Sequence, residues 1–200
     1  MSIKRKTAVK TIIPCFKDND ILIFLGAGLC KEAYNYDRDG NFYIKEDNSN
    51  GLLVALGIAM NTNKRVFVFC NDSDLLKSIG SMLNVAVSEC RNIFIIIFSS
   101  GKYQESGGQP TIFNNISAPK NILFSMGFLI FDYTQYLKNK SVIKELKQLI
   151  ERTNGPAAAL IKISPGISKE GAIFIDNKLL VDRIKVFIQN TNIGTSLYRS

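Results

Sequence analysis

The strongest constraint on the fold of this chain is a set of short, mostly apolar runs. None of them approaches the roughly 20 residues that a membrane-spanning helix needs. Runs of this length without alternation of polar and apolar residues are typical of strands covered on both faces in a parallel sheet. They occupy residues 21–25, 66–70, 93–98, 128–131 and 157–163.

Two intervening segments have the spacing of unusually apolar helices. Residues 51–60 form one, and residues 75–88 form the other, with apolar stripes on two adjacent faces. Such helices are expected to be covered on more than one side. Gly57 and Gly80 lie inside them, and an interior glycine costs about 1 kcal/mol relative to alanine, so these positions predict close approach by a neighbour. A subunit interface is one explanation, and packing on the chain's own sheet is the other.

Three further helices are expected. Pro119 opens one toward Met126, Ser141 caps one over residues 142–152, and a last one spans residues 181–189. The alternation of strands and helices predicts a three-layer α/β/α fold with a mainly parallel sheet. At 200 residues, the chain is expected to form a single domain over residues 1–200.

Composition excludes several kinds of chemistry. The chain has no histidine, which removes Ser-His-Asp and Cys-His nucleophile pairs and histidine-ligated metals. Its net charge is +8, and the basic residues at 4–6 and 10 are expected to lie exposed on a terminal segment. No nucleic-acid-binding motif accompanies the charge, so neither nucleic acid nor a membrane is an expected partner.

The four cysteines predict reduced thiols. Cys15, Cys30, Cys70 and Cys90 form no CxxC pair, and Cys70 and Cys90 are expected to be largely buried. No secretory signal is recognisable in the sequence, so the expected location is cytoplasmic.

Ligands bind beyond the carboxyl ends of strands in an open parallel sheet, and three loops qualify. The first is Gly26-Ala27-Gly28, which could seat a phosphate at a helix N-terminus or form a plain tight turn. The second is 70–74, where Asp72 is a candidate cation ligand and Asp74 is expected to cap the following helix. The third runs from Ser99 to Thr111, where glycines let main-chain amides approach an anion; a plain surface loop is the alternative.

The second and third loops together resemble the thiamine-diphosphate-binding domain of the sulfopyruvate and phosphonopyruvate decarboxylases. Tyr103, followed by Ser106-Gly107-Gly108-Gln109-Pro110-Thr111, is close to the family pattern YGSTGGQPT. Residues 71–74 match the family's GDGS segment, and Ser100 stands where the family has an asparagine. Asn50 stands where the family's GSMG turn has its methionine. The resemblance covers nearly the whole chain.

The resemblance implies that the chain binds thiamine diphosphate through Mg²⁺. The implied metal ligands are Asp72, the Ser100 hydroxyl and the Lys102 carbonyl. The implied cofactor-binding residues are Gly26, Gly28, Asn50, Asn71, Ser73, Asp74, Lys102, Tyr103, Gly107 and Gly108.

The implied activity is decarboxylation of a small anionic 2-oxoacid such as sulfopyruvate or phosphonopyruvate. No catalytic residue is expected in this chain, because the family's activating glutamate lies on a pyrimidine-binding domain. A separate subunit would carry that glutamate, which makes a hetero-oligomer. Two alternatives stay open: a non-catalytic scaffold subunit with a degenerate cofactor site, and a carboligating relative in specialised biosynthesis.

Overall fold

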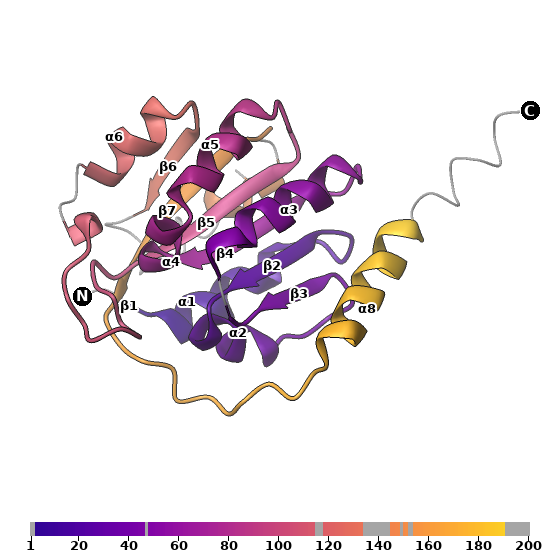
Figure 1. Cartoon of the computed structure of the whole chain (residues 1–200), viewed down its shortest axis with the longest axis horizontal. Helices are drawn as coiled ribbons and strands as arrows, with labels where there is room; N and C mark the ends of the chain where they lie inside the picture. The colour runs from indigo at the N-terminus through magenta and orange to yellow at the C-terminus, as the bar shows by residue number, and fades with distance from the viewer. Residues whose placement is uncertain are drawn as a thin grey trace, which may run out of the picture.

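The computed structural model describes residues 3–46, 48–114, 118–133, 145–148, 150–151 and 154–190. A parallel sheet lies between two layers of helices, which confirms the expected three-layer fold (Figure 1). The strands are β1 (Ile3–Lys4), β2 (Ile21–Leu25), β3 (Asn41–Ile44), β4 (Val66–Asn71), β5 (Ile93–Ser99), β6 (Leu129–Tyr133) and β7 (Ala157–Ser164). The helices are α1 (Arg5–Ile12), α2 (Ala27–Tyr34), α3 (Gly51–Met60), α4 (Asp72–Lys77), α5 (Ile79–Val87), α6 (Ala118–Ser125) and α8 (Asn177–Gln189).

All the paired strands run parallel, in the order β1-β7-β5-β4-β2-β3. The outer edge of β7 is shared by two strands. Its first five residues pair with β6, and Ile163 and Ser164 pair with β1. The central strands β2, β4 and β5 are buried along their whole length, which explains why their sequences show no polar alternation.

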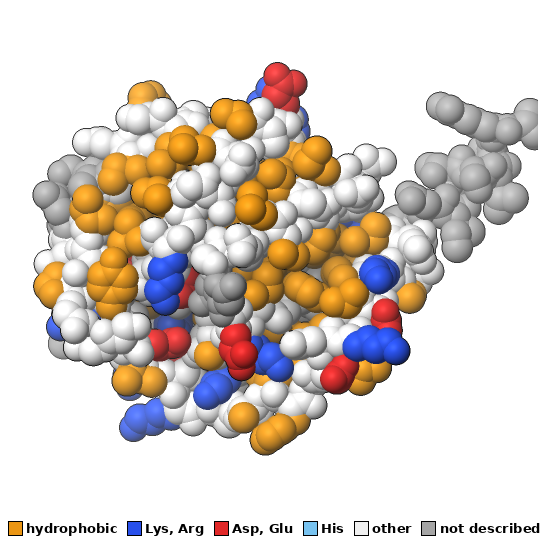
Figure 2. Space-filling model, in the orientation of Figure 1, with side chains coloured by type: hydrophobic (Ala, Val, Ile, Leu, Met, Phe, Trp, Pro, Cys, Tyr) orange, Lys and Arg blue, Asp and Glu red, His pale blue; other side chains and the backbone are white. Residues whose placement is uncertain are grey.

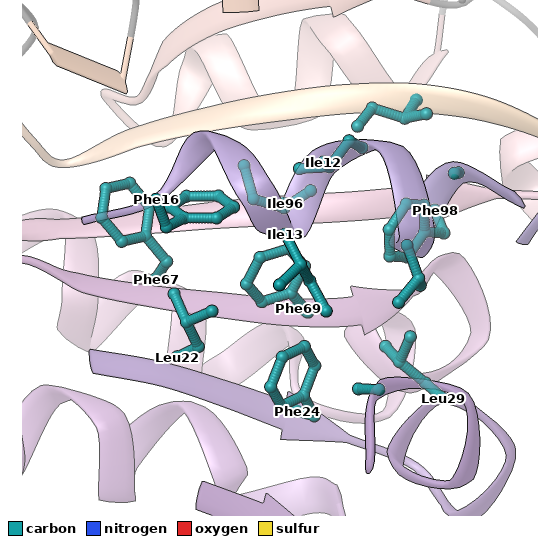
Figure 3. Packing of buried hydrophobic residues seen from close by; sticks show 14 of the residues in the cluster. Ile12, Ile13, Phe16, Leu22, Phe24, Leu29, Phe67, Phe69, Ile96 and Phe98 are labelled. Atoms are coloured by element: carbon teal, nitrogen blue, oxygen red, sulfur yellow. The ribbon is translucent and has the colours of Figure 1, made fainter. Parts of the chain in front are cut away.

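Each face of the sheet has its own apolar core. On one face, α1, α2 and the helical residues 145–148 cover a stack of phenylalanines from β2, β4 and β5. Figure 3 shows Phe24, Phe67, Phe69 and Phe98 of this stack. Phe16 lies over Phe67 and Phe69, with ring centroids 4.7 and 5.4 Å apart. On the other face, α3, α4, α5 and α6 cover the alternate residues of the same strands. The sheet is therefore fixed from both sides, which holds the carboxyl ends of β4 and β5 in place.

Several elements differ from the sequence-based expectation. The expected helix over residues 75–88 is two helices, α4 and α5, because the chain leaves helical geometry at Ser78 (φ −108°, ψ 18°). Helix α8 begins four residues earlier than expected, where Asp176 accepts hydrogen bonds from the amides of Lys178 and Leu179. Helix α6 matches its prediction, and Gly127 (φ 91°) follows it. The expected start at Ser141 lies outside the described residues.

The expectation of an exposed basic N-terminal segment is wrong for Arg5. Residues 5–12 form α1, and Arg5 is only 4% exposed. Ala8, Val9 and Ile12 form the buried face of α1, so the segment is an amphipathic helix rather than a tail.

The outer surfaces of α3 and α5 are apolar and exposed (Figure 2). Exposed side chains include Leu53, Val54, Met60, Leu83 and Val87. Neither helix contains a charged residue. A Cβ atom added at Gly57 or at Gly80 would meet nothing within 4 Å, so no neighbour within the described part of the chain explains these glycines.

All four cysteines are free thiols, as expected. Cys30 and Cys70 are buried, whereas Cys15 and Cys90 are partly exposed, so the expectation for Cys90 is wrong. None of the described helices is long and apolar enough to cross a membrane.

Candidate active site

The loops that follow β4 and β5 meet at the carboxyl edge of the sheet. Asn71 on β4 pairs with Phe98 on β5, so Asp72 and Ser100 follow adjacent ends of neighbouring strands. The two segments singled out from the sequence therefore lie side by side, as the parallel topology predicts.

Asp72 joins these two loops. It is the first residue of α4 and is fully buried. Its Oδ2 atom accepts hydrogen bonds from the amide of Gly101 at 2.7 Å and from the hydroxyl of Thr111 at 3.1 Å. Its Oδ1 atom accepts from the amide of Ser73 at 3.2 Å. Burial raises the pKa of Asp72 above its ordinary value, and these hydrogen bonds partly oppose that rise.

Asn71, rather than Asp74, is the N-cap of α4. The two residues form a capping box in which the main-chain amide of Asn71 donates to Oδ2 of Asp74 at 3.4 Å, and the side-chain Nδ2 of Asn71 donates to the same oxygen at 2.7 Å. Asp74 occupies the third helical position, which corrects the expectation that it caps the helix. Asn71 has a φ of −85°, so this position does not need the conformational freedom of glycine. Ser73 is partly buried in the first turn of α4.

Ser100 and Lys102 form a compact pair of oxygens. The Ser100 hydroxyl donates to the Lys102 carbonyl at 3.2 Å and accepts from the Lys102 amide at 3.3 Å. Two adjacent ligands of an octahedral Mg²⁺, each roughly 2.1 Å from the ion, are about 3.0 Å apart. The Ser100 hydroxyl and the Lys102 carbonyl therefore have nearly the separation of such a ligand pair.

The rest of the third loop is held by main-chain contacts. The main-chain carbonyl of Tyr103 accepts from the amide of Gly108 at 2.8 Å, and the amide of Tyr103 donates to the main-chain carbonyl of Gln109 at 2.9 Å. Gly107 and Gly108 have φ values of 94° and 76°, which side-chain-bearing residues rarely adopt. These two glycines are therefore required by the path of the loop itself. The side chain of Lys102 is exposed.

An unexpected carboxylate lies at the start of α2. Gly26 has a φ of 97° and precedes the helix, and the amide of Gly28 donates to Oε1 of Glu105 at 3.1 Å. A Cβ atom at Gly28 would clash with that oxygen and would lie 2.6 Å from Nη2 of Arg5. An acidic group of the chain itself therefore occupies the helix N-terminus for which the sequence left open a phosphate seat or a plain tight turn.

Asn50 lies beside the site rather than within its hydrogen-bond network. It ends the short 3-10 turn Asn48–Asn50 and is exposed at the start of α3. That turn packs against α4 and accepts a hydrogen bond from the Ser81 hydroxyl through the Ser49 carbonyl.

Sequence reasoning missed four polar residues of this region: Arg5, Glu32, Glu105 and Thr111. Arg5 forms a buried ion pair with Glu32 and donates to Asn71 at 2.8 Å. Gln104 and Glu105 replace the glycine and serine of the YGSTGGQPT pattern, and this departure was the available signal for Glu105. Nothing in the sequence distinguishes Arg5 from the basic residues on either side of it.

Within the described residues, no group of three or more cysteine, aspartate or glutamate side chains could hold a metal ion. A cation at this edge would therefore depend on Asp72 together with neutral oxygens.

Comparison with known proteins supports the resemblance. No family model matches the chain. It is 23% identical over 184 residues to sulfopyruvate decarboxylase subunit beta of Methanothermobacter thermautotrophicus, covering 92% of this chain and 94% of that protein. It is 24% identical over 168 residues to phosphonopyruvate decarboxylase of Streptomyces viridochromogenes, covering 83% of this chain and 41% of the relative. The chain is a relative of the sulfopyruvate and phosphonopyruvate decarboxylases.

The fold likeness extends to a solved structure. A thiamin diphosphate-dependent enzyme from Mycobacterium smegmatis superposes with a TM-score of 0.65 at 14% identity, over 82% of this chain and 32% of that one. This chain thus spans almost the whole length of the M. thermautotrophicus beta subunit. It spans less than half of the longer phosphonopyruvate decarboxylase and of the M. smegmatis chain.

Proposed function

We propose that this chain is the diphosphate-binding subunit of a thiamine-diphosphate-dependent 2-oxoacid decarboxylase, folded as a single domain over residues 1–200. The observation that carries the proposal is the buried carboxylate of Asp72, placed between the ends of β4 and β5 and fastened to the loop after β5. Its relatives named as decarboxylases support the reaction class.

The residues at this edge fit a magnesium ion. Asp72 would supply the charged ligand through Oδ1, which accepts from the amide of Ser73 at 3.2 Å, whereas Oδ2 already accepts from Gly101 and Thr111. The Ser100 hydroxyl and the Lys102 carbonyl, 3.2 Å apart, would supply two neutral oxygens. A single carboxylate with carbonyl and hydroxyl oxygens is a suitable set for Mg²⁺, which also binds phosphate oxygens of its ligand.

The diphosphate would be held by main-chain amides. Gly107 is exposed in the third loop, and Gly108, whose own amide donates to Tyr103, sets the path of that loop. Gly26 and Gly28 open α2, whose N-terminus favours an anion. Ser73, in the first turn of α4, would add a hydroxyl beside Asp72. Asn71 and Asp74 would fix this turn, and Asn50, Lys102 and Tyr103 would border the cofactor. When bound, thiamine diphosphate stabilises the negative charge left on the substrate carbon as CO₂ departs.

A second subunit would complete the site. The face of α3 and α5 is apolar, carries no charge and contains two glycines with open space above them. These features suit close helix packing by another chain. We propose that a pyrimidine-binding subunit covers this face and supplies the activating glutamate, and that the substrate is a small anionic 2-oxoacid such as sulfopyruvate or phosphonopyruvate.

The test is calorimetric titration of thiamine diphosphate into the chain and its co-purified partner, with and without Mg²⁺. Asp72→Asn should abolish the magnesium-dependent binding. Asp18→Asn is the matched control, because it removes the same charge from a fully exposed side chain. Ser100→Asn should tighten binding, since an amide oxygen is a better ligand than a hydroxyl. Absence of binding in the unmodified complex, unchanged by Ser100→Asn, would sink the proposal.

That negative outcome would favour the scaffold alternative. Two observations support it as the second candidate: Glu105 occupies the amide of Gly28, and Oδ2 of Asp72 already accepts two hydrogen bonds. A subunit of this kind would keep its fold and interface while its ligand positions are filled by the chain itself.

A further inference from the structure

Arg5 is a buried cation with a carboxylate partner on a neighbouring helix. Its Nε atom lies 2.8 Å from Oε2 of Glu32, and its Nη2 atom donates to Oε1 at 3.4 Å. The two side chains are 3% and 6% exposed. The guanidinium is planar, so this pairing with Glu32 fixes the direction of its remaining N–H groups.

The third nitrogen of Arg5 faces the end of β4. Nη1 donates to Oδ1 of Asn71 at 2.8 Å, while the Nδ2 atom of Asn71 donates to Oδ2 of Asp74 at 2.7 Å. Both ends of the Asn71 amide are thus held, one by α1 and the other by α4. Asp72 is the next residue, so the direction in which its carboxylate leaves the strand depends on how Asn71 is held.

We infer that Arg5 is a positioning residue for Asp72: clamped by Glu32, it holds Asn71 and so aims the Asp72 carboxylate at the loop after β5. The inference rests on the proposed function only in giving Asp72 the role of cation ligand. Arg5 itself is not a cation ligand in this scheme. Residues that orient a metal ligand typically change metal affinity about 10- to 100-fold when replaced.

The same strand offers a matched control at its other end. Arg65 immediately precedes β4 and pairs with Asp20 through Nε–Oδ1 at 2.9 Å and Nη2–Oδ2 at 2.7 Å. Its third nitrogen donates to the main-chain oxygen of Ile150. Arg65 and Arg5 thus make the same kind of forked pair, but Arg65 lies at the edge of the sheet away from Asp72. If Arg5 acted only through the overall stability of the chain, Arg5→Gln and Arg65→Gln would change Gly101 protection and Mg²⁺ affinity equally.

The first readout needs no cofactor. The amide of Gly101 donates to Asp72, so its hydrogen-exchange protection reports whether the carboxylate keeps its direction. The experiment compares the hydrogen-exchange protection of Gly101 with that of the Val68 amide, in the middle of β4, in the cofactor-free complex of the chain and its partner. Arg5→Gln should lower this relative protection at least tenfold, whereas Arg65→Gln should leave it unchanged.

The second readout is the affinity of the complex for Mg²⁺ at saturating thiamine diphosphate. Arg5→Gln should weaken it about 10- to 100-fold, and Arg65→Gln should not. Arg5→Lys keeps the charge but lacks the fork, so it should restore stability without restoring Mg²⁺ affinity. If Arg5→Gln fails to fold, Glu32→Gln, which removes the clamp and keeps the guanidinium, should shift both readouts in the same direction.

The outcomes separate the inference from the proposed function. Equal effects of Arg5→Gln and Arg65→Gln on Gly101 protection, or no effect of Glu32→Gln where Arg5→Gln does not fold, would overturn the inference. Selective loss of Gly101 protection in a complex that binds no Mg²⁺ would uphold the inference while the proposed function fails. Loss of both Gly101 protection and Mg²⁺ affinity in Arg5→Gln, but not in Arg65→Gln, would support the inference and the proposed function together.

Discussion

The carboxylate of Asp72 accepts a hydrogen bond from the amide of Gly101 at 2.7 Å and thereby ties the end of β4 to the loop that follows β5. Asp72 has a structural effect as well as its proposed role as ligand. Removing the side chain would leave a buried amide and the Thr111 hydroxyl without an acceptor, at about 1–3 kcal/mol for each group. Asp72→Ala should therefore cause a measurable loss of stability in urea unfolding.

Thr111→Val should destabilise the chain by about 1.5–3 kcal/mol, the usual contribution of a hydrogen bond to a charged group. Its hydroxyl donates to Asp72 at 3.1 Å, and valine has nearly the same shape. Urea unfolding measures the effect. Thr11→Val is the control, because the Thr11 hydroxyl donates only to the carbonyl of Thr7 in α1. Equal losses at the two positions would contradict the role given to Thr111.

Magnesium affinity should weaken as the pH is lowered. Burial raises the pKa of Asp72 above its ordinary 3.8, so protons compete with the cation at a higher pH than for an exposed carboxylate. In the metal-free chain, the folded state binds more protons than the unfolded state between 3.8 and the raised pKa, so stability falls as pH rises through that window. Calorimetry across pH, with Asp72→Asn as reference, measures both effects. A pH-independent Mg²⁺ affinity would count against Asp72 as the ligand.

Glu105→Gln should tighten the binding of inorganic pyrophosphate with Mg²⁺. The carboxylate accepts from the amide of Gly28 and would compete with an anion for the start of α2. A charge at a helix N-terminus is worth about 0.3–1 kcal/mol, which predicts a gain of about two- to fivefold. Titration of the complex measures it, and Glu151→Gln at an exposed position controls for net charge. An equal gain in both variants would show a general charge effect.

Gly57→Ala and Gly80→Ala should stabilise the isolated chain and weaken the complex. An added Cβ meets nothing within 4 Å at either position, and alanine favours a helix over glycine by about 1 kcal/mol. Thermal unfolding measures the first effect, and ultracentrifugation with the partner measures the second. The unmodified chain alone is expected to self-associate at micromolar concentration or to need its partner, so a well-folded monomer would count against this interface. Gly51→Ala is the contrast, because its Cβ would lie 2.5 Å from Leu25. Unchanged complex affinity would show that this face is not the interface.

Alkylation of the native chain should distinguish two pairs of cysteines. Cys30 and Cys70 are buried, and burial raises the pKa of both thiols, so they should react only after denaturation. Cys15 and Cys90 are partly exposed and should react first. Mass spectrometry under non-reducing conditions should find four thiols in the denatured protein. A disulfide would contradict the four free thiols of the structure.

The sequence predicts the central strands well and the edges of the sheet poorly. Residues 21–25, 66–70 and 93–98 lie between two helical layers, so burial on both faces leaves an unmistakable apolar run. Strand β3 is buried at alternate positions only, and β1 is two residues long; neither leaves such a run. An exposed terminal segment is expected from the sequence in place of α1, because basic residues dominate this stretch and only Ala8, Val9 and Ile12 show the apolar spacing of a helix.

The candidate site also has one part that the sequence predicts and one part that it does not. The position of Asp72 beside Ser100 follows from strand order in a parallel sheet and could be predicted. Arg5, Glu32 and Asn71 come from three separate elements, and their contacts depend on how two helices pack against the sheet. Residue spacing along the chain does not predict contacts between such distant positions, so this network is found only in the folded structure.

The pairing of β1 with β7 determines when the site can form during synthesis. Ile3 lies opposite Ile163, and Arg5 follows β1 directly. A growing chain on the ribosome has no edge for β1 until β7 has emerged, by which time β4 and β5 are long complete. Asp72 and its loop can therefore assemble early, whereas the clamp on Asn71 closes among the last contacts to form. A chain that ends before residue 157 would carry Asp72, Ser100 and Lys102 and still lack the anchor that seats Arg5.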